Sequence, residues 1–300
     1  MGVGKLNVCF LADRVYPSYP YSINNSRDTT NFSQYILFDR YNYGLKTHFY
    51  SFTEALNTVG NPDRKFVLLN ESRTIVPAWY DVILKNRQRI ENEFDLVFTY
   101  DEEILNRFSN ARFVPIDANY WYGENDSSAV SSESWKHKTR NISVIASFKT
   151  ICKMHEVRRQ VARICKAQNL ADTYGNFDIK PGQKKEHFPT ELPFQHYRYS
   201  IVIENNISAF YFTEKLTNCF AAQTIPVYLG ASQIHKFFNP DGIITISLDD
   251  LDNLPEILKQ CTPEEYERRL PAVLDNFKRV QEFACPVDYM YTHYLREYFE

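Results

Sequence analysis

The sequence predicts an α/β protein made of two halves around a cleft, each half built on a mostly parallel sheet with helices on both faces. The first observation is that strand-like and helix-like segments alternate along the second half, which is typical of parallel sheets. The second is that polar clusters directly follow predicted strands, at the sheet edge where such proteins bind ligands. The chain has 300 residues, of which 44% are hydrophobic, so it is long and apolar enough to bury such cores.

The first half of the chain has the less regular pattern. Its predicted strands are residues 5–11 (KLNVCFL), 64–70 (RKFVLLN) and 94–100 (FDLVFTY), and its predicted helices are residues 28–41 and 101–108. Residues 122–140 are polar and rich in serine, without a clear periodicity, so they are the predicted linker. We therefore expect an N-terminal domain at residues 1–138 and a C-terminal domain, with the last helices, at residues 139–300.

The second half alternates clearly between the two kinds of segment. Its predicted strands are residues 141–148, 197–205, 224–230 and 242–248, and its predicted helices are residues 155–168, 213–223, 254–261 and 262–283. The helix at 155–168 places Val157, Val161 and Ile164 on one face at helical spacing. Residues 178–193 lack any such pattern and are predicted to form a loop.

The predicted helix at 262–283 has a recognisable start. Thr262 is placed as its N-cap, Pro263 occupies the first helical position, and Glu265 follows three residues after the cap. Pro271 falls inside the helix and is expected to kink or divide it.

Composition argues against several classes of protein. The net charge of -3 produces no global field toward nucleic acid or an acidic membrane, so no nucleic-acid partner is expected. No run of about 18 apolar residues occurs, so no membrane span is expected. The six cysteines are far apart and form no CxxC pair, which favours buried reduced thiols over a metal or redox site.

Two polar clusters stand out, IENN at Ile203–Asn206 and TEK at Thr213–Lys215. The second opens a predicted helix, whose free N–H groups and partial positive charge suit a phosphate. Lys215 would add a full positive charge, and Glu214 could accept two hydroxyls of a ribose or a sugar. The ordinary alternative is that an acid is favoured in any first helical turn and that the lysine is only solvated.

The whole stretch IVIENNISAFYFTEKLTNCFAAQTIPVYLG resembles the signature of the α-1,3/4-fucosyltransferases, glycosyltransferase family 10. That family reads F-E-N-S, then Y-V-T-E-K, then G-T-(V/I)-P-V. The resemblance implies a GT-B fold with two Rossmann-like domains facing a cleft. It also implies a donor-nucleotide site made by the matching residues, Asn205, Tyr211, Thr213, Glu214 and Lys215. Three positions depart from the pattern, where Ile203, Asn206 and Gln223 replace Phe, Ser and Gly.

The resemblance extends upstream in a weaker form. The segment ASFKTICKMHEVRRQVARICKAQ is similar to the part of the family that carries the pyrophosphate arginine. Arg158 matches that arginine, with Arg159 as the neighbouring alternative. The segment LLNESRTIVP is similar to the E-S-P region of the family and places Glu71 on its proposed general base.

The chemistry of sugar transfer explains why such groups are needed. The attacking hydroxyl must lose a proton, which requires a base such as Glu71. The leaving nucleoside diphosphate gathers negative charge, which requires cations such as Arg158 and Lys215. Positive charge on the sugar ring could be stabilised by Glu204 or Glu214. LDDLD at 248–252 fits a turn better than a metal-binding D-x-D, so no essential divalent ion is expected.

The resemblance therefore implies an inverting glycosyltransferase that moves L-fucose from GDP-fucose to a glycan acceptor. The acceptor would be a hydroxyl of an N-acetylglucosamine or glucose residue, most simply in an α-1,3 linkage. Its likeness to bacterial members implies a cytoplasmic location, with peripheral contact at the inner face of the membrane left open. Two alternatives remain: the same scaffold with another GDP-sugar, and a glycan- or nucleotide-binding module without turnover.

Overall fold

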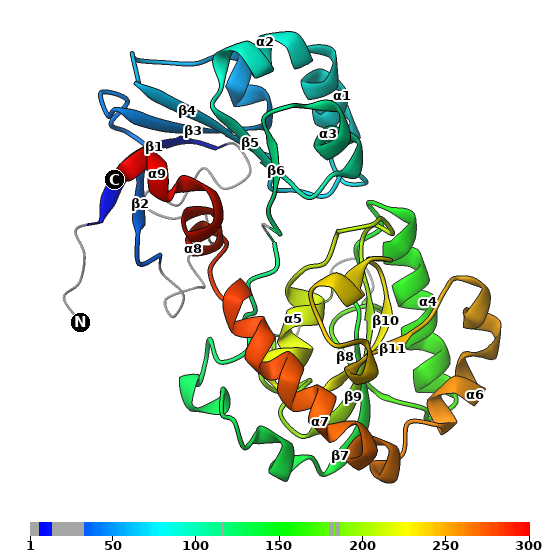
Figure 1. Ribbon diagram of the computed structural model, residues 1–300. Coiled ribbons are helices and arrows are strands. Elements are labelled where there is room, and N and C mark those ends of the chain that lie inside the picture. Colours follow the sequence, from blue (N-terminus) through cyan, green and yellow to red (C-terminus); the bar gives the residue numbers. More distant parts are fainter. Residues whose placement is uncertain (1–5, 14–32, 116, 180–182, 184–186) are drawn as a thin grey trace. The chain divides into compact units, whose positions relative to one another are not determined.

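The computed structural model describes residues 6–13, 33–115, 117–179, 183 and 187–300 (Figure 1). The chain folds as two compact units. Unit 1 consists of Met1–Asn119 together with Glu282–Glu300, and unit 2 is the continuous segment Tyr120–Gln281. Each unit is described by itself.

Unit 1 is built on a six-stranded parallel sheet. Its strands follow the order β2 (Ile36–Asp39), β1 (Asn7–Ala12), β3 (Thr47–Ser51), β4 (Arg64–Leu68), β5 (Leu96–Thr99) and β6 (Ala111–Phe113). Because successive side chains of a strand point to opposite faces, Val67 and Phe66 face different layers. Val67 packs with α1 (Pro77–Lys85), α2 (Arg87–Glu93) and α3 (Glu102–Arg107), whereas Phe66 meets Tyr298 of the C-terminal segment.

The C-terminal segment covers the second face of this sheet with α8 (Pro286–Met290) and α9 (Arg296–Phe299), drawn in red in Figure 1. Its rings meet aromatic side chains of unit 1: Phe98 lies 6.1 Å from Tyr294, centroid to centroid, and Tyr35 stacks on Tyr291 at 4.3 Å. The carboxylate of Asp288 accepts hydrogen bonds from the Ser33 hydroxyl and the Gln34 N–H. Residues 282–300 are therefore an integral layer of unit 1.

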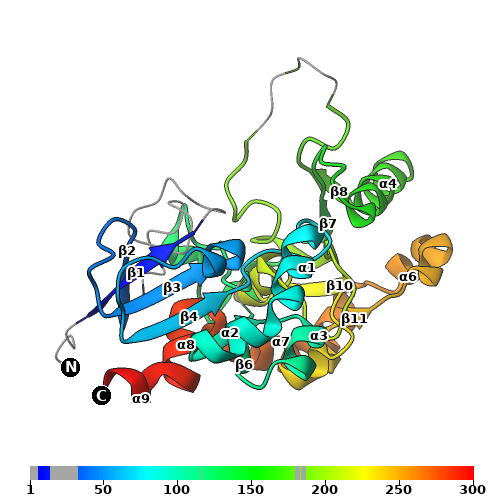
Figure 2. The same cartoon turned by 90° about the horizontal axis from the view of Figure 1, so that it is seen from above.

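Unit 2 is built on a five-stranded parallel sheet. Its strands follow the order β11 (Ile244–Thr245), β10 (Ile225–Leu229), β9 (Tyr197–Ile203), β7 (Arg140–Ile145) and β8 (Asp172–Tyr174). Helices α4 (Lys153–Ala167) and α6 (Leu254–Lys259) bury apolar side chains against one face, and Figures 1 and 2 show them on the same side of the sheet. Helix α5 (Glu214–Ala221) contacts β9 and β10, and α7 (Pro263–Val280) contacts α5.

The division into units differs from the predicted boundary at 138/139. Unit 2 already begins at Tyr120, and the last residues, from Glu282, belong to unit 1 rather than to the C-terminal domain. The predicted linker 122–140 is held within unit 2 by buried polar side chains. Asn218 accepts from the N–H groups of Trp121 and Tyr122, and Glu191 accepts from those of residues 123, 125 and 126.

Several elements differ from the sequence prediction. The helix predicted at 28–41 is wrong over its described part, because β2 occupies Ile36–Asp39 with Ile36 and Phe38 buried; residues 28–32 lie outside the described residues. The pattern analysis missed β3, β6, β8, α1 and α2. Pro271 does not divide α7, which continues from Pro263 to Val280. The N-cap prediction at Thr262 is confirmed, since its hydroxyl accepts from the Glu265 N–H at 3.2 Å.

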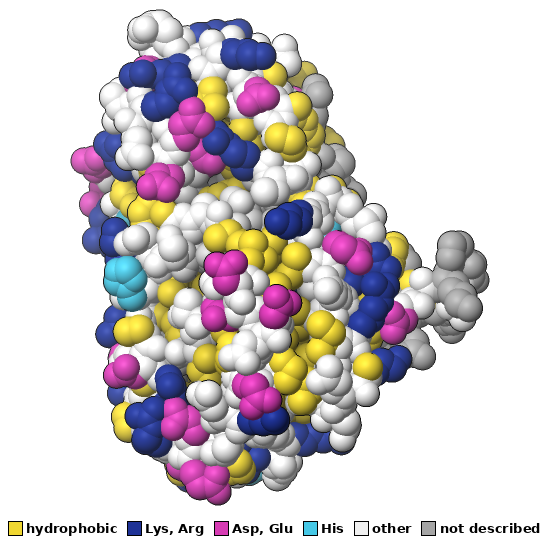
Figure 3. Space-filling model, turned by 90° about the vertical axis from the view of Figure 1, so that its right-hand side faces the viewer, with side chains coloured by type: hydrophobic (Ala, Val, Ile, Leu, Met, Phe, Trp, Pro, Cys, Tyr) yellow, Lys and Arg dark blue, Asp and Glu magenta, His cyan; other side chains and the backbone are white. Residues whose placement is uncertain are grey.

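The remaining composition-based expectations concern cysteines, charge and membrane spans. All six cysteines are free thiols and all except Cys152 are buried, as expected. On the face shown in Figure 3, Lys and Arg side chains are interspersed with Asp and Glu, in line with the small net charge. Within the described ranges, no helix combines the length and the apolar character needed to cross a bilayer.

Candidate functional site

The candidate site of unit 2 lies where β7 and β9 end. These strands are neighbours in a parallel sheet, so their carboxyl ends lie at the same edge. Each is followed by a loop and then by a helix, α4 after β7 and α5 after β9. The N-termini of both helices therefore point their free N–H groups and partial positive charge toward this edge.

Glu204, directly after β9, organises the start of α5. It is fully buried, and its two carboxylate oxygens accept hydrogen bonds from the N–H and the hydroxyl of Thr213, both at 2.9 Å. Thr213 is the N-cap of α5 and accepts in turn from the Lys215 N–H. Burial raises the pKa of Glu204, while the positive charge of Lys215 opposes that change. Glu204 thus holds the loop onto the helix from inside the protein.

Lys215 and Glu214 form the exposed side of this cluster. The Lys215 ammonium lies 2.9 Å from a carboxylate oxygen of Glu214, 3.0 Å from the Thr213 hydroxyl and 3.9 Å from Glu204. Burial alone would lower the pKa of Lys215, but the carboxylates of Glu214 and Glu204 raise it above its usual value. The Lys215 side chain keeps 26% of its surface exposed, and its raised pKa keeps the ammonium charged at pH 7.

Arg158 of α4 joins the same cluster from the neighbouring helix. Its guanidinium donates to the Ile203 carbonyl and, from Nη2, to the side-chain oxygen of Asn205 at 3.0 Å. The arginine is buried, which lowers its pKa, and the charges of Glu204 and Glu214 counteract this effect. These hydrogen bonds are made by Nε and Nη2 of Arg158. Its third nitrogen, Nη1, makes none of these bonds to the described residues.

Arg159, the neighbouring alternative, points elsewhere. Its Nε donates to the Phe177 carbonyl at 3.3 Å, and its Nη1 pairs with Glu156 at 2.9 Å. The structure therefore groups Arg158, and not Arg159, with Glu204 and Lys215.

His155 lies close to these cations, and its pKa is lowered. This buried imidazole sits on the first turn of α4, and its pKa is lowered to about 4 by burial and by the charges of Arg158, Lys149 and Lys215. The side chain is therefore neutral at pH 7. Burial is the largest cause of this shift, and the three nearby cations add to it.

The other residues predicted for the donor site are also found here. Tyr211 and Thr213 are buried in the loop between β9 and α5, and Asn205 holds Arg158. Of the three departures from the family pattern, Ile203 packs in the core of unit 2. Gln223 has a φ of 57°, in the left-handed region where glycine is usual. Its buried side chain bonds the Trp135 N–H at 2.7 Å and the Ser131 carbonyl at 2.9 Å.

Glu71 belongs to unit 1, in the loop that follows β4. One of its carboxylate oxygens accepts from the Ser72 N–H at 2.6 Å, and its carbonyl accepts from the Tyr80 hydroxyl at 2.9 Å. The preceding Asn70 is 1% exposed, and neither polar atom of its side chain is hydrogen-bonded in the described part of the chain. A buried amide without partners is uncommon and points to a polar ligand or water.

The residues that secure positions 121–135 were missed by sequence reasoning. Asn218, Glu191 and Gln223 each bind backbone groups more than 60 positions away in the sequence. Only the glycine-to-Gln223 departure gave a signal. No spacing rule connects the other two with their targets.

The LDDLD segment was predicted as a turn, but four of its five residues lie in a short 3-10 helix, Asp249–Asn253, that leads into α6. The carboxylate of Asp250 accepts from both the N–H and the hydroxyl of Ser247 at 2.7 Å. Across the described ranges no group of three or more His, Cys, Asp or Glu side chains is arranged to hold a metal ion. The expectation that no divalent ion is essential stays a prediction.

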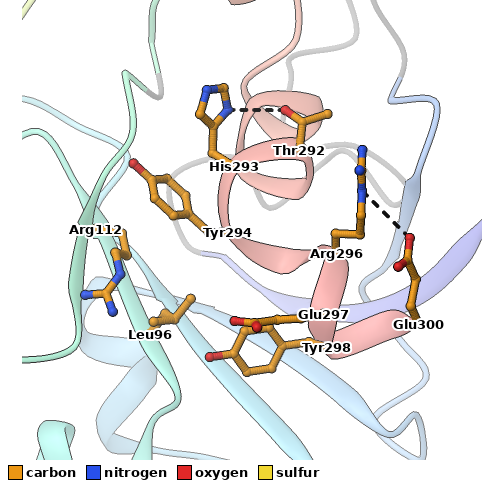
Figure 4. A pocket seen from close by; sticks show the side chains of 9 residues that line it. All are labelled: Leu96, Arg112, Thr292, His293, Tyr294, Arg296, Glu297, Tyr298 and Glu300. Carbon is orange, nitrogen blue, oxygen red and sulfur yellow. Dashed lines mark hydrogen bonds and ion pairs between the residues drawn. The ribbon is translucent and has the colours of Figure 1, made fainter.

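A cavity of about 430 Å³ lies in unit 1 and contains none of the predicted site residues (Figure 4). Leu96 and Arg112 line it from β5 and β6, and Tyr294 and Tyr298 from the C-terminal segment. Leu96 is the first residue of β5, so the cavity lies toward the amino edge of the sheet, whereas Glu71 follows a carboxyl end.

The comparisons with known proteins agree with this geometry. Residues 135–268 match the family model described as "Glycosyltransferase family 10 (fucosyltransferase) C-term". This range lies wholly within unit 2 and contains all the residues of the β9–α5 cluster.

Similar folds are found among solved structures. An α1,3-fucosyltransferase with GDP-fucose is 15% identical, with a TM-score of 0.54, and the match covers 93% of this chain and 88% of that one. An α1,3-fucosyltransferase with GDP is also 15% identical, with a TM-score of 0.53, and the match covers 94% of this chain and 91% of that one. TarM is 10% identical, with a TM-score of 0.51, and the match covers 85% of this chain and 55% of that one. At these identities the likeness concerns the fold, and it confirms an α/β protein with two Rossmann-like domains of the GT-B type.

The motif from Glu204 to Lys215, its position at a helix start and the family model lead to the same assignment. Residues 135–268 therefore match the C-terminal domain of glycosyltransferase family 10, in agreement with the resemblance seen in the sequence.

Proposed function

We propose that this glycosyltransferase transfers L-fucose from GDP-fucose to a hydroxyl of an N-acetylglucosamine or glucose residue in a glycan, with inversion and in an α-1,3 linkage. The observation that carries the proposal is the cluster of Arg158 and Lys215 at two adjacent helix starts. Two structures of similar fold are of α1,3-fucosyltransferases with GDP and with GDP-fucose.

In the proposed donor complex the diphosphate binds at this edge of the sheet. Its oxygens accept from Nη1 of Arg158 and from the Lys215 ammonium, in charge-assisted hydrogen bonds. Lys215 then exchanges part of its pairing with Glu214 for the diphosphate. Glu214 is left to accept hydroxyls of the ribose or the fucose, and its negative charge stabilises positive charge that develops on the sugar ring.

Glu204 was predicted as a catalytic carboxylate, and its geometry supports a different task. Both of its oxygens are occupied by Thr213, and none of its surface is exposed. We assign it to positioning: it fixes the N-cap of α5 and, through it, the site of Lys215. The catalytic role at the ring passes to Glu214 in this proposal.

Glu71 is the proposed base. Its carboxylate is only partly buried and already accepts one backbone hydrogen bond, which keeps the side chain in one orientation. The buried amide of Asn70, which has no hydrogen-bond partner among the residues described, supports a polar ligand beside it. The acceptor hydroxyl would give its proton to Glu71 as it attacks C1 of fucose, while GDP leaves with the bonding electron pair.

A donor and acceptor matrix tests the proposal. GDP release is measured with GDP-fucose or GDP-mannose, each with and without N-acetyllactosamine, and the product is analysed by NMR for linkage and anomeric configuration. We expect acceptor-dependent release with GDP-fucose and an α-linked product. Preference for GDP-mannose would establish the same scaffold with another sugar, and GDP-fucose binding without any release would establish a binding module.

A further inference from the structure

The loop that carries Glu71 has an arginine where the family pattern has a proline. The segment reads Glu71-Ser72-Arg73 in place of E-S-P and connects β4 to α1. A proline restricts its own φ and so stiffens a loop without any side-chain contact. An arginine does not restrict φ in this way, but its side chain can order the loop through the contacts that it makes.

The guanidinium of Arg73 is bound to the start of α3. Its Nη1 donates to Glu103 at 2.8 Å, and its Nε lies 3.0 Å from a carboxylate oxygen of Asp101, an ion pair without hydrogen-bond geometry. It also lies over the ring of Tyr80, 5.0 Å from the centroid. Asp101 itself is fixed, because it is the N-cap of α3 and accepts from the Ile104 N–H at 3.1 Å. The contact therefore joins the loop to a rigid element.

The main chain of the loop is tied down at the same place. The N–H of Arg73 donates to the Tyr100 hydroxyl at 2.7 Å, and the Tyr80 hydroxyl donates to the Glu71 carbonyl at 2.9 Å. Between these two anchors lies the fully buried Ser72, whose N–H donates to the Glu71 carboxylate at 2.6 Å. Any shift of residue 73 therefore moves the peptide group that orients the carboxylate of Glu71.

We infer that Arg73 is a positioning residue for Glu71: its ion pairs with Asp101 and Glu103 hold the Ser72 peptide in place and thereby aim the carboxylate. This inference rests on the proposed role of Glu71 as the base. In this view Arg73 orders the loop as the proline of the family pattern would, but through ion pairs instead of a restricted φ. A misplacement of about 1 Å in a reacting group costs on the order of 100-fold in rate.

Steady-state kinetics of single variants give the first test, with GDP-fucose and N-acetyllactosamine. Arg73→Ala is expected to lower kcat by about ten- to a hundredfold, with the KM for GDP-fucose and the affinity for GDP unchanged, and to displace the acidic limb of the pH profile of kcat. Asp101→Asn keeps the N-cap but loses the charge, so it should show the same split. Arg73→Lys should lose less activity than Arg73→Ala, because the lysine ammonium can keep part of the pairing with Asp101 and Glu103.

The matched control is Arg107→Ala. Arg107 pairs with the other oxygen of Glu103 at 2.7 Å but does not contact the loop, so this variant should keep the parent kcat. Arg73→Ala with a parent-like kcat and pH profile would overturn the inference. Circular dichroism and thermal melting of each variant separate a folding defect from a kinetic one, and Arg73→Lys serves if Arg73→Ala does not fold.

The double variant Arg73→Ala/Glu71→Gln separates this inference from the proposed function. If Arg73 acts through Glu71, the double variant is no slower than Glu71→Gln alone. An additional loss of the same size as in Arg73→Ala would show a separate effect and overturn the inference. A parent-like rate in Glu71→Gln would instead overturn the base assignment and, with it, the positioning role.

Discussion

Arg158 and Lys215 reach the same edge of the unit 2 sheet from two different helices, and both lie close to carboxylates of the protein. Their charges are therefore partly neutralised before a ligand arrives. In the proposed donor complex the diphosphate would compete with Glu214 for Lys215, whereas at Arg158 it would bind Nη1, which is not used in the bonds to Ile203 and Asn205. This difference leads to an expectation for the two side chains.

Truncation of either cation should weaken GDP binding. A charge-assisted hydrogen bond is worth roughly 1.5–3 kcal/mol, which corresponds to about a tenfold or greater loss of affinity. We expect calorimetry to show this loss for Lys215→Ala and for Arg158→Ala. Lys259→Ala on α6, an exposed lysine that pairs with Glu256, is the matched control and should bind GDP like the parent. Parent-like affinity in both site variants would contradict the donor-site assignment.

Replacement of Glu71 should separate binding from transfer. Glu71→Gln keeps the shape of the side chain and removes the proton acceptor, so the transfer rate is expected to fall by about 10²–10⁴-fold. GDP affinity should stay unchanged, because Glu71 lies in unit 1 and the donor cluster in unit 2. Calorimetry and initial rates on the same preparation check both halves of this expectation.

At the scale of elements, the segment from Tyr120 to Lys138 is the clearest case of order without a local pattern. Lys138 closes this segment. Its ammonium is buried and donates to the Phe194 carbonyl and the Thr224 hydroxyl, both at 2.9 Å. Burial lowers its pKa from 10.5 to about 7. A neutral amine has two N–H donors, and the site offers two acceptors, so the neutral form fits without an unpaired group.

The stability of unit 2 should therefore rise with pH above 7. Between the folded pKa of about 7 and the unfolded value of 10.5, the unfolded chain binds more protons at Lys138 than the folded chain does. The free energy of unfolding then increases by up to about 1.4 kcal/mol per pH unit. Urea unfolding at pH 6, 7.5 and 9 should show this rise in the parent and in Lys136→Met, an exposed neighbour. Lys138→Met should flatten it, and an unchanged slope in that variant would contradict the assignment.

The sequence was informative where periodicity is local and strong. The strands β7, β9 and β10 and the helices α4, α5 and α7 were all predicted within a few positions. Short elements were missed. For example, β2 has only four residues, and it is a strand because it pairs with β1 and packs Phe38 against Phe49 of β3. Residues 122–140 were predicted as a linker because their partners, Glu191, Asn218 and Gln223, lie far along the chain. The choice of Arg158 over Arg159 also depends on three-dimensional contacts that no spacing rule gives.

At the scale of the whole molecule, activity is expected without a divalent ion. The cations that would meet the leaving diphosphate are side chains of the protein, Arg158 and Lys215, and such groups can take the place of a metal. Transfer should therefore continue at near the parent rate in EDTA. Loss of activity in chelator, with recovery on addition of manganese or magnesium, would contradict this expectation and would make the LDDLD segment a candidate metal site.

The C-terminal segment that completes unit 1 has a consequence for how the protein is made. The ribosome releases residues 1–119 first, then the whole of unit 2, and only then residues 282–300. At 5–20 residues per second, the wait between the two parts of unit 1 lasts roughly ten to thirty seconds. During this time Phe66 and Phe98 lack the rings of Tyr298 and Tyr294 that pack against them in the finished protein. Unit 2 is a continuous segment, so it can fold as soon as it leaves the ribosome. The first part of unit 1 exposes aromatic side chains until the last helices are made, and such a surface favours chaperone binding.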